Sequence, residues 1–260
     1  MKGLRYVFLL VLIVVMAASV SFGASADKDV IYQISTLGAL QEGVYDGVAT
    51  MKELKKHGDF GIGTFEGLDG ELTELNGKFY QIKADGKVYQ VADTIKTPFA
   101  AVTYFETDKK VALDQPMDFK QLQDYFQSQL PSPNIPYAVK ITGSFTYVKT
   151  RSVPKQSKPY PRLVEVTKNQ PTFEMKDVTG TILGYWLPQY LAGVNMAGYH
   201  FHFLTDDKQG GGHLLEIQLT KGTLELDYTY GLELVLPSQS DFFKTDLSGD
   251  KTKELESIEK

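Results

Sequence analysis

The sequence predicts an α+β protein with two β-rich subdomains, mixed or antiparallel sheets and few helices. Short segments rich in β-branched and aromatic residues follow one another, separated by glycine-containing turns, while helical periodicity is rare. A proline-rich segment at 154–161 is the best candidate for a linker. We therefore expect an N-terminal α+β half at 27–153 and a β-rich half at 154–260 that ends in a polar tail.

The first 26 residues have the pattern of a secretory signal peptide. Lys2 and Arg5 precede an apolar run at 6–20, and small residues follow it. The run has about 15 residues, fewer than the ~20 that cross a bilayer, which favours cleavage over a membrane-anchoring helix. Cleavage is expected after Gly23 or Ala26. We therefore expect a secreted protein that has no membrane contact once the signal is removed.

The elements of the first half follow from local patterns. Residues 30–36 read as a strand, and residues 49–57 read as a helix that Gly58 ends. Because His57 lies in the last turn of that helix, we interpret it as structural. Turn residues then separate a series of β segments, at 61–65, 71–75, 78–82, 87–91 and 99–105. Apolar residues at helical spacing predict a helix over 118–130, which the prolines at 131–136 end.

The rest of the chain is mainly β. We expect strands at 137–150 and 172–187, a histidine-containing hairpin, strands at 222–230 and 232–237, and a tail from 241 that ends in a helical turn. Hairpins with turn glycines occur in both halves. A duplicated β-α-β motif is therefore a further hypothesis.

Three of the four histidines lie within fourteen residues, at His200, His202 and His213. Residues i and i+2 of a strand point to the same face, so His200 and His202 can address one point. The turn formers at 206–212 predict a hairpin that pairs His202 with His213 and centres its turn near residues 207–208. Three imidazoles then converge on one face.

This arrangement predicts a metal site. Three nitrogen ligands with a vacant fourth position are typical of catalytic zinc, whereas structural zinc sites usually use cysteine, which the chain lacks. Imidazole also suits copper, iron and nickel, although zinc is favoured. The alternative is that the histidines lie close together without binding a metal. Phe201 and Phe203 argue against it, because they give the opposite face of the strand an apolar character.

Charge narrows the range of partners. The net charge of −5 becomes more negative when Lys2 and Arg5 are removed, and no basic cluster appears. Nucleic acid is therefore not an expected partner. Beyond residue 26 the only arginines are Arg151 and Arg162, among many lysines. Each arginine therefore calls for a specific explanation, such as a two-point contact with a carboxylate.

Several motifs together resemble those of the alpha-acetolactate decarboxylase family. They are the sequences at 63–72 (GTFEGLDGEL), 150–156 (TRSVPKQ), 158–161 (KPYP), 198–203 (GYHFHF) and 212–213 (GH). They occur in the family's order and spacing, and the resemblance extends from about residue 31 to the C-terminus. As a set they are far more specific than any one of them alone.

The resemblance implies a two-domain α+β zinc enzyme that is generally a homodimer. It assigns the metal ligands to His200, His202 and His213. The other site residues that it implies are Glu71 beside the metal, Arg151 in contact with the substrate, Thr64 in the pocket wall, and Glu259 from the C-terminal tail, with Glu256 as the second choice. Read without the resemblance, Glu71 is a residue after a turn and Glu259 is part of a tail.

The implied reaction is the zinc-dependent decarboxylation of (S)-2-acetolactate to (R)-acetoin and CO2. Zinc can bind the hydroxyl and ketone oxygens of the substrate as a Lewis acid. It can also stabilise the enediolate that forms when CO2 leaves. A glutamate then protonates the carbon. The sequence leaves open whether Glu71 or Glu259 is this acid, although Glu71 has the more rigid mount.

Other functions are weighed against this one. A secreted zinc hydratase or hydrolase of the carbonic anhydrase type also places three histidines on antiparallel strands, but it leaves Glu71 and Arg151 unexplained. Cupins use a His-x-His pair, but their glutamate and distant last histidine do not match this spacing. A non-enzymatic zinc-binding domain predicts a complete ligand set.

Overall fold

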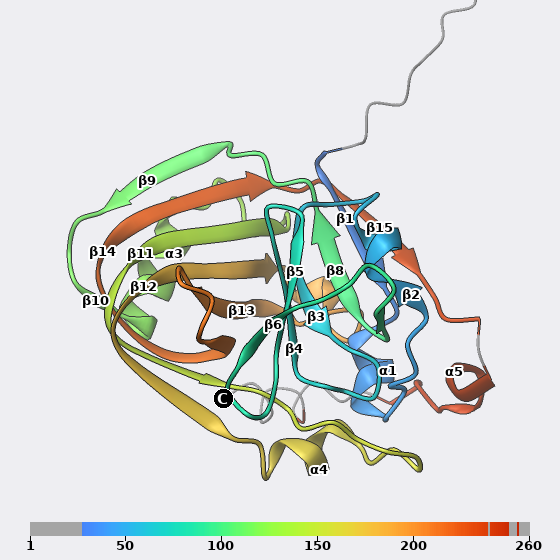
Figure 1. Ribbon diagram of the computed structural model, residues 1–260. Helices are drawn as coiled ribbons and strands as arrows, with labels where there is room; N and C mark the ends of the chain where they lie inside the picture. Colours follow the sequence, from blue (N-terminus) through green and yellow to red (C-terminus); the bar gives the residue numbers. More distant parts are fainter. Residues whose placement is uncertain (1–27, 239, 250–253, 255–260) are drawn as a thin grey trace, which may run out of the picture.

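Two β-sheets, each strongly curved, pack against each other and carry only short helices around them (Figure 1). The computed structural model describes residues 28–238, 240–249 and 254. The predicted signal peptide at 1–26 lies outside this range and stays a prediction. In the described part of the chain, no helix is long and apolar enough to cross a membrane.

The first sheet has seven strands in the order β15-β1-β8-β3-β4-β5-β6. β1 and β15 pair in parallel and the other neighbours are antiparallel, so the sheet is mixed. Its strands are β1 (Val30–Ile34), β3 (Phe60–Thr64), β4 (Glu71–Leu75), β5 (Lys78–Ile82), β6 (Val88–Gln90), β8 (Ala100–Thr103) and β15 (Gly231–Val235). The short strands β2 (Ala49–Thr50) and β7 (Lys96–Thr97) pair separately.

The second sheet is antiparallel and contains the long strands. Its strands are β9 (Lys109–Leu113), β10 (Met117–Asp118), β11 (Tyr137–Arg151), β12 (Thr172–Leu187), β13 (Gly198–Thr205) and β14 (Gly211–Tyr228). β14 pairs with β11 along most of its length, and its first residues also pair with β13. Register shifts between Ser144 and Thr150 bend β11 against β14. The sheet therefore curls until its two sides meet at the histidine hairpin.

The helices of the described chain are few and short, as the sequence predicts. They are α1 (Leu37–Gln41), α2 (Met51–Leu54), α3 (Phe119–Gln129), α4 (Leu163–Thr167), α5 (Ser240–Lys244) and a 3-10 turn at Gln189–Leu191. In α3, the Asp118 side chain accepts from the backbone N–H of Gln121, and the Gln121 side chain accepts in return from the N–H of Asp118. This capping box explains why the predicted helix begins where it does.

Two predicted elements were wrong. The expected helix at 49–57 begins as β2, and its helical part α2 ends at Leu54. The expected separate strand at 222–230 is the continuation of β14. Gly222, where that strand was expected to begin, lies within β14. It lies opposite Gly143 of β11, and a Cβ on Gly222 would lie only 2.7 Å from the carbonyl oxygen of Thr142. The glycine allows two strands to approach closely.

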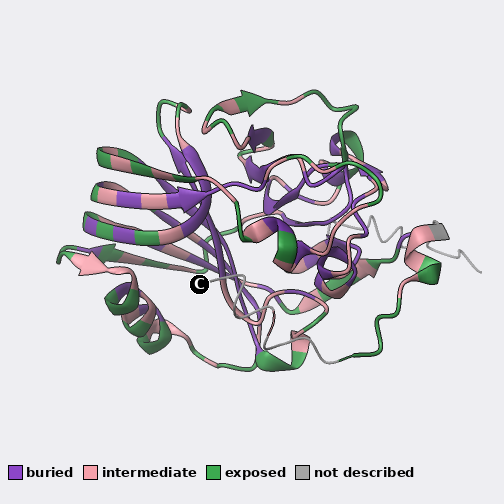
Figure 2. Ribbon diagram, turned by 90° about the horizontal axis from the view of Figure 1, so that it is seen from below, coloured by how far each residue is buried: buried purple, intermediate pink, exposed green. Residues whose placement is uncertain are grey.

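Apolar side chains fill the space between the sheets and the inside of the curled sheet. One core cluster joins Ile31, Phe60 and Ile62 of the first sheet to Leu183 and Tyr185 of the second. Figure 2 shows the buried residues concentrated where the sheets meet. The segment at 154–161 does not separate the two sheets. β11 precedes it and pairs with β12, which follows it. The proposed domain boundary at this segment stays a prediction.

Glu74 of β4 is a buried carboxyl group on the face of the first sheet that lies away from the histidines. The side chain has no exposed surface, and in the described part of the chain no hydrogen bond reaches either of its oxygens. Burial, with a further contribution from Asp59, raises its pKa to about 9. The group is therefore neutral at physiological pH.

Glu74→Gln is expected to reduce the fall in the free energy of unfolding that accompanies a rise in pH. Between the ordinary pKa near 4.5 and about 9, the unfolded chain releases a proton that the folded chain keeps, so the free energy of unfolding falls as pH rises. The maximal slope is about 1.4 kcal/mol per pH unit. Urea unfolding at pH 5 to 9 measures it. Parallel pH curves for the two proteins would contradict the prediction.

Candidate metal centre and active site

The three histidines lie where the curled sheet closes. β13 pairs with β14 so that His202 is directly opposite His213, as the sequence predicts, and Lys208 in the connecting turn has a positive φ of 58°. The rings of His200, His202 and His213 have centroids 5.2 to 5.6 Å apart. One nitrogen of each ring lies within 4.8 Å of the others. The three side chains thus converge on one point.

All three histidines are buried. His202 has no exposed surface, and His200 and His213 are 8% and 4% exposed. Phe201 and Phe203, which alternate with them, point to the other face and belong to the core of the second sheet. Burying three imidazoles without a ligand would be costly, because each ring carries polar nitrogens. Their burial together is what a metal-binding site requires.

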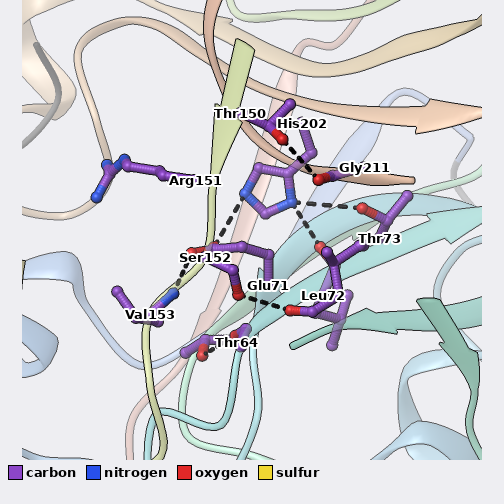
Figure 3. Close-up of polar contacts among 12 residues, drawn as sticks. Thr64, Glu71, Leu72, Thr73, Thr150, Arg151, Ser152, Val153, His202 and Gly211 are labelled. Carbon is purple, nitrogen blue, oxygen red and sulfur yellow. Dashed lines mark hydrogen bonds and ion pairs between the residues drawn. The ribbon is translucent and has the colours of Figure 1, made fainter. Parts of the chain in front are cut away.

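Contacts to the first sheet fix the orientation of His202. Its Nδ1 lies 2.8 Å from the carbonyl oxygen of Leu72 and 3.4 Å from Oγ1 of Thr73 (Figure 3). A carbonyl oxygen only accepts, so Nδ1 must donate and carry the proton. In the neutral ring the lone pair then belongs to Nε2. This is the usual arrangement for a histidine that binds a metal through Nε2.

Glu71 lies beside the histidines at the start of β4. Its Oε2 is 3.4 Å from Nε2 of His202, and its Oε1 accepts the backbone N–H of Val153 at 3.3 Å. The residue is 7% exposed. The tight turn before it places Leu68 and Gly70 at positive φ, and Oγ1 of Thr64 donates to the carbonyl of Gly70. Thr64 and Gly70 thereby hold Glu71 in a fixed place.

Arg151 ends β11 directly opposite His213 of β14. Residues opposite each other in an antiparallel pair lie on the same face, so Arg151 shares the face of the histidine. It is 3% exposed, and its Nη1 donates to Oε1 of Gln170 at 2.7 Å. A buried guanidinium at this position is suited to bind a carboxylate.

A cavity brings these groups together. Thr64, Glu71, Arg151, His200 and His213 form its polar side. Its apolar side consists of Leu37, Leu40, Leu68, Phe99, Val153 and Leu163. The cavity therefore has one wall that can bind polar atoms and one that can contact alkyl groups, which is the usual composition of a small-molecule site.

The structure brings the predicted site residues of its described part together, and their roles stay predictions. Glu259 and Glu256 lie outside the described residues. His57 is not part of the histidine cluster and stacks on Tyr32, with 3.6 Å between ring centroids, in keeping with its structural interpretation. The sequence did not identify the contacts from Leu72, Thr73 and Gln170, or the apolar wall. These belong to other strands and helices, and their local sequence carries no signal of the contact.

Comparisons with known proteins give one family. A family model described as alpha-acetolactate decarboxylase matches residues 31–249. The alpha-acetolactate decarboxylase of Methanosarcina mazei is 48% identical over 233 residues, which cover 90% of this chain and 81% of that protein. That of Brevibacillus brevis is 43% identical over 234 residues, covering 90% and 82%. The crystal structure of the Bacillus subtilis strain 168 protein has a TM-score of 0.87 at 39% identity and covers 88% of this chain and 99% of that one.

Proposed function

The chain belongs to the alpha-acetolactate decarboxylase family, and we propose that it converts (S)-2-acetolactate to (R)-acetoin and CO2 with a zinc ion held by His200, His202 and His213. As an acetolactate decarboxylase it is a carboxy-lyase. The observation that carries the proposal is a cluster of three buried histidines, two of which line one cavity together with a buried arginine and a buried glutamate.

The donor set fits zinc. Three neutral imidazoles provide nitrogen ligands and leave a coordination position for the substrate. When bound, zinc supplies a Lewis acid that polarises the oxygens of the substrate. The hydrogen bond from Nδ1 of His202 to the Leu72 carbonyl keeps Nε2 available as a ligand.

The chain's own residues account for the rest of the reaction. Arg151 is placed to bind the carboxylate of acetolactate and to fix the carbon–carbon bond that breaks. The electron pair of that bond passes to the neighbouring ketone as CO2 leaves, which gives an enediolate. Glu71 or Glu259 then donates a proton to the carbon and recovers one from water. Delivery from one face gives a single enantiomer of acetoin.

The test is to incubate the purified protein with racemic acetolactate and follow CO2 and acetoin before and after chelation. We expect one acetoin per CO2, mainly the R enantiomer, activity lost on chelation and restored by zinc. A protein that contains zinc, makes no acetoin, and hydrates CO2 or cleaves esters would instead support the hydratase or hydrolase alternative. One that binds zinc without any turnover would support the zinc-binding domain.

Arg151→Lys is expected to be strongly impaired although it keeps the charge. An ammonium group cannot reproduce the planar two-point contact of a guanidinium with a carboxylate. Loss of a charge-assisted hydrogen bond of about 2 kcal/mol lowers kcat/KM by about 30-fold. Steady-state kinetics at matched zinc content measures this. Wild-type turnover and KM would remove Arg151 from the site.

Deletion of residues 258–260 tests the predicted role of Glu259. If this glutamate protonates or orients the substrate, the shortened protein should lose activity or enantiomeric purity of acetoin while keeping its zinc. The loss expected of a general acid is about 100-fold or more. Chiral analysis of the product, with zinc content as the control, decides it. Full activity and selectivity would show that Glu259 has no such role.

We further propose that the protein is exported with cleavage after Gly23 or Ala26, and that it forms a homodimer. The amino-terminal pattern supports the first and the family resemblance the second. N-terminal sequencing of the exported protein and light scattering test them. A retained N-terminus or a monomeric mass would contradict the respective proposal.

A further inference from the structure

Arg162, the second of the two arginines beyond residue 26, connects three separate parts of the chain. It precedes α4, and its Nε lies 3.1 Å from both carboxylate oxygens of Glu42, with Nη2 at 2.6 Å from Oε1. The same Nη2 lies 2.9 Å from Oε1 of Glu254. Glu42 is the C-cap residue directly after α1. One guanidinium thus joins α4, α1 and the C-terminal segment.

Lys158, four residues earlier, repeats this arrangement. Its Nζ contacts Asp46 and also lies 2.9 Å from Oδ2 of Asp241 in α5. Tyr160 donates to the other oxygen of Asp46 at 3.1 Å. The hydrogen bond from Lys158 lowers the pKa of the Asp241 carboxyl. Two cations four residues apart therefore each bind one acid that follows α1 and one acid of the C-terminal segment. We call the set of Glu42, Asp46, Lys158, Arg162, Asp241 and Glu254 the charge clamp.

The charge clamp joins the two helices that supply part of the apolar wall of the cavity. Leu37 and Leu40 of α1 and Leu163 of α4 line the cavity, and they pack in one core cluster with Tyr45. α1 and α4 contact each other, and Figure 1 shows both in the lower part of the molecule. The clamp residues Glu42 and Arg162 adjoin this wall in sequence, two residues from Leu40 and one from Leu163 respectively.

Local structure alone does not hold this wall. α1 and α4 have five residues each, and no side-chain hydrogen bond caps α4. Helices of this length are not stable by themselves. The ion pairs of the clamp are partly exposed, with 38% exposure for the Arg162 side chain, so they contribute little to global stability. Their effect is local, because they fix the ends of two short helices against each other.

We propose that Arg162 and Lys158 are positioning residues that set the apolar wall against the alkyl groups of the substrate and so determine which 2-alkyl-2-hydroxy-3-oxo acids fit. This inference rests on the proposed function. Acetolactate presents two methyl groups besides its three oxygen functions, and the cavity offers them the wall of Leu37, Leu40 and Leu163. A fixed wall discriminates by size, and one methylene is worth about 10- to 200-fold in kcat/KM.

The test compares Arg162→Gln and Lys158→Gln with a matched control, Lys140→Gln. Lys140, near the start of β11, forms an ion pair with Glu225 at 3.2 Å and does not belong to the charge clamp. A charge-exchanged protein, Glu42→Arg and Glu254→Arg with Arg162→Glu, restores both ion pairs with reversed polarity. Each protein is loaded with zinc, and kinetics is measured with acetolactate and with its 2-ethyl homologue. Hydrogen exchange in α1 and α4 is measured in parallel.

In Arg162→Gln we expect KM for acetolactate to rise about fivefold or more, kcat to stay within about twofold, and the preference between the methyl and ethyl substrates to shift towards ethyl. Amides of α1 and α4 should exchange faster. Lys158→Gln should change KM and substrate preference in the same direction, and Lys140→Gln should match wild type. The charge-exchanged protein should have a KM close to that of wild type. The proposal would be overturned if Arg162→Gln left KM, substrate preference and the rate of hydrogen exchange unchanged. It would also be overturned if the charge-exchanged protein had no lower KM than Arg162→Gln. If wild type makes no acetoin, the proposed function fails, while the exchange rates still report on the clamp.

Discussion

His202→Ala is expected to abolish activity and to reduce the zinc content to well below one per chain. The mutation removes one of three nitrogens that lie within 4.8 Å of one another. Two imidazoles hold zinc much more weakly, and the Lewis acid supplies several kcal/mol of transition-state stabilisation. A loss of about 4 kcal/mol corresponds to about a 1000-fold lower rate. Elemental analysis of protein purified without a metal-affinity tag, together with acetoin formation, measures both effects.

His57→Ala is the matched control, because His57 stacks on Tyr32 outside the cavity. It should keep both zinc and activity. His202→Ala also deprives the Leu72 carbonyl of its donor and leaves space in the core, so some loss of stability is independent of metal. His213→Ala is therefore a second test of the ligand set, because it leaves the hydrogen bond between His202 and the Leu72 carbonyl in place. Zinc should raise the melting temperature of wild type and much less that of either ligand variant. Equal zinc content and activity in wild type and both variants would rule out the site.

The ligand geometry could be predicted because it is local. The spacing of His200 and His202 and the turn that follows set which residue faces His213. The alternation with Phe201 and Phe203 also showed which face is apolar. The strands of the first sheet were predictable for the same reason, since turn residues separate them. Local rules of strand period and turn chemistry thus account for the hairpin that carries the histidines.

The rest of the site depends on contacts between the two sheets, which local patterns do not encode. Glu71 reads as a residue after a turn, and only the packing of β4 against β13 places it 3.4 Å from His202. The hydrogen bond from His202 to the Leu72 carbonyl could not be predicted either. Every residue has a backbone carbonyl, so the sequence does not indicate which one a histidine contacts. The resemblance to a family supplied Glu71, which residue patterns alone did not. The scarcity of arginine had already marked Arg151, and the resemblance added its contact with the substrate.

The apolar wall was missed for another reason. α1 and α4 have only five residues each, too few for helical periodicity to appear. Their position depends on packing against residues distant in sequence and on the ion pairs of Arg162. The scarcity of arginine was the one available signal, and it indicated that Arg162 has a specific role without indicating its partners.

Glu71→Gln is expected to lower kcat by about 100-fold or more while zinc and substrate still bind, if Glu71 is the acid that protonates the enediolate. The amide keeps the size of the side chain and can still accept a hydrogen bond from the N–H of Val153, so the side chain should keep its position. It has no acidic proton to deliver. Protonation follows substrate binding, so KM should change little. Water could then protonate either face of the intermediate, which lowers the enantiomeric purity of acetoin.

Glu74→Gln is the matched control for this experiment, because Glu74 lies three residues further along the same strand and on its other face. It should leave turnover and the enantiomeric purity of acetoin unchanged. If Glu71 instead orients metal or substrate, Glu71→Gln should raise KM or lose zinc, and the enantiomeric purity should be retained. That result, combined with a loss of purity on removal of residues 258–260, would assign proton donation to Glu259. The fixed position of Glu71, held between the turn at Gly70 and the Val153 N–H, favours Glu71 as the donor.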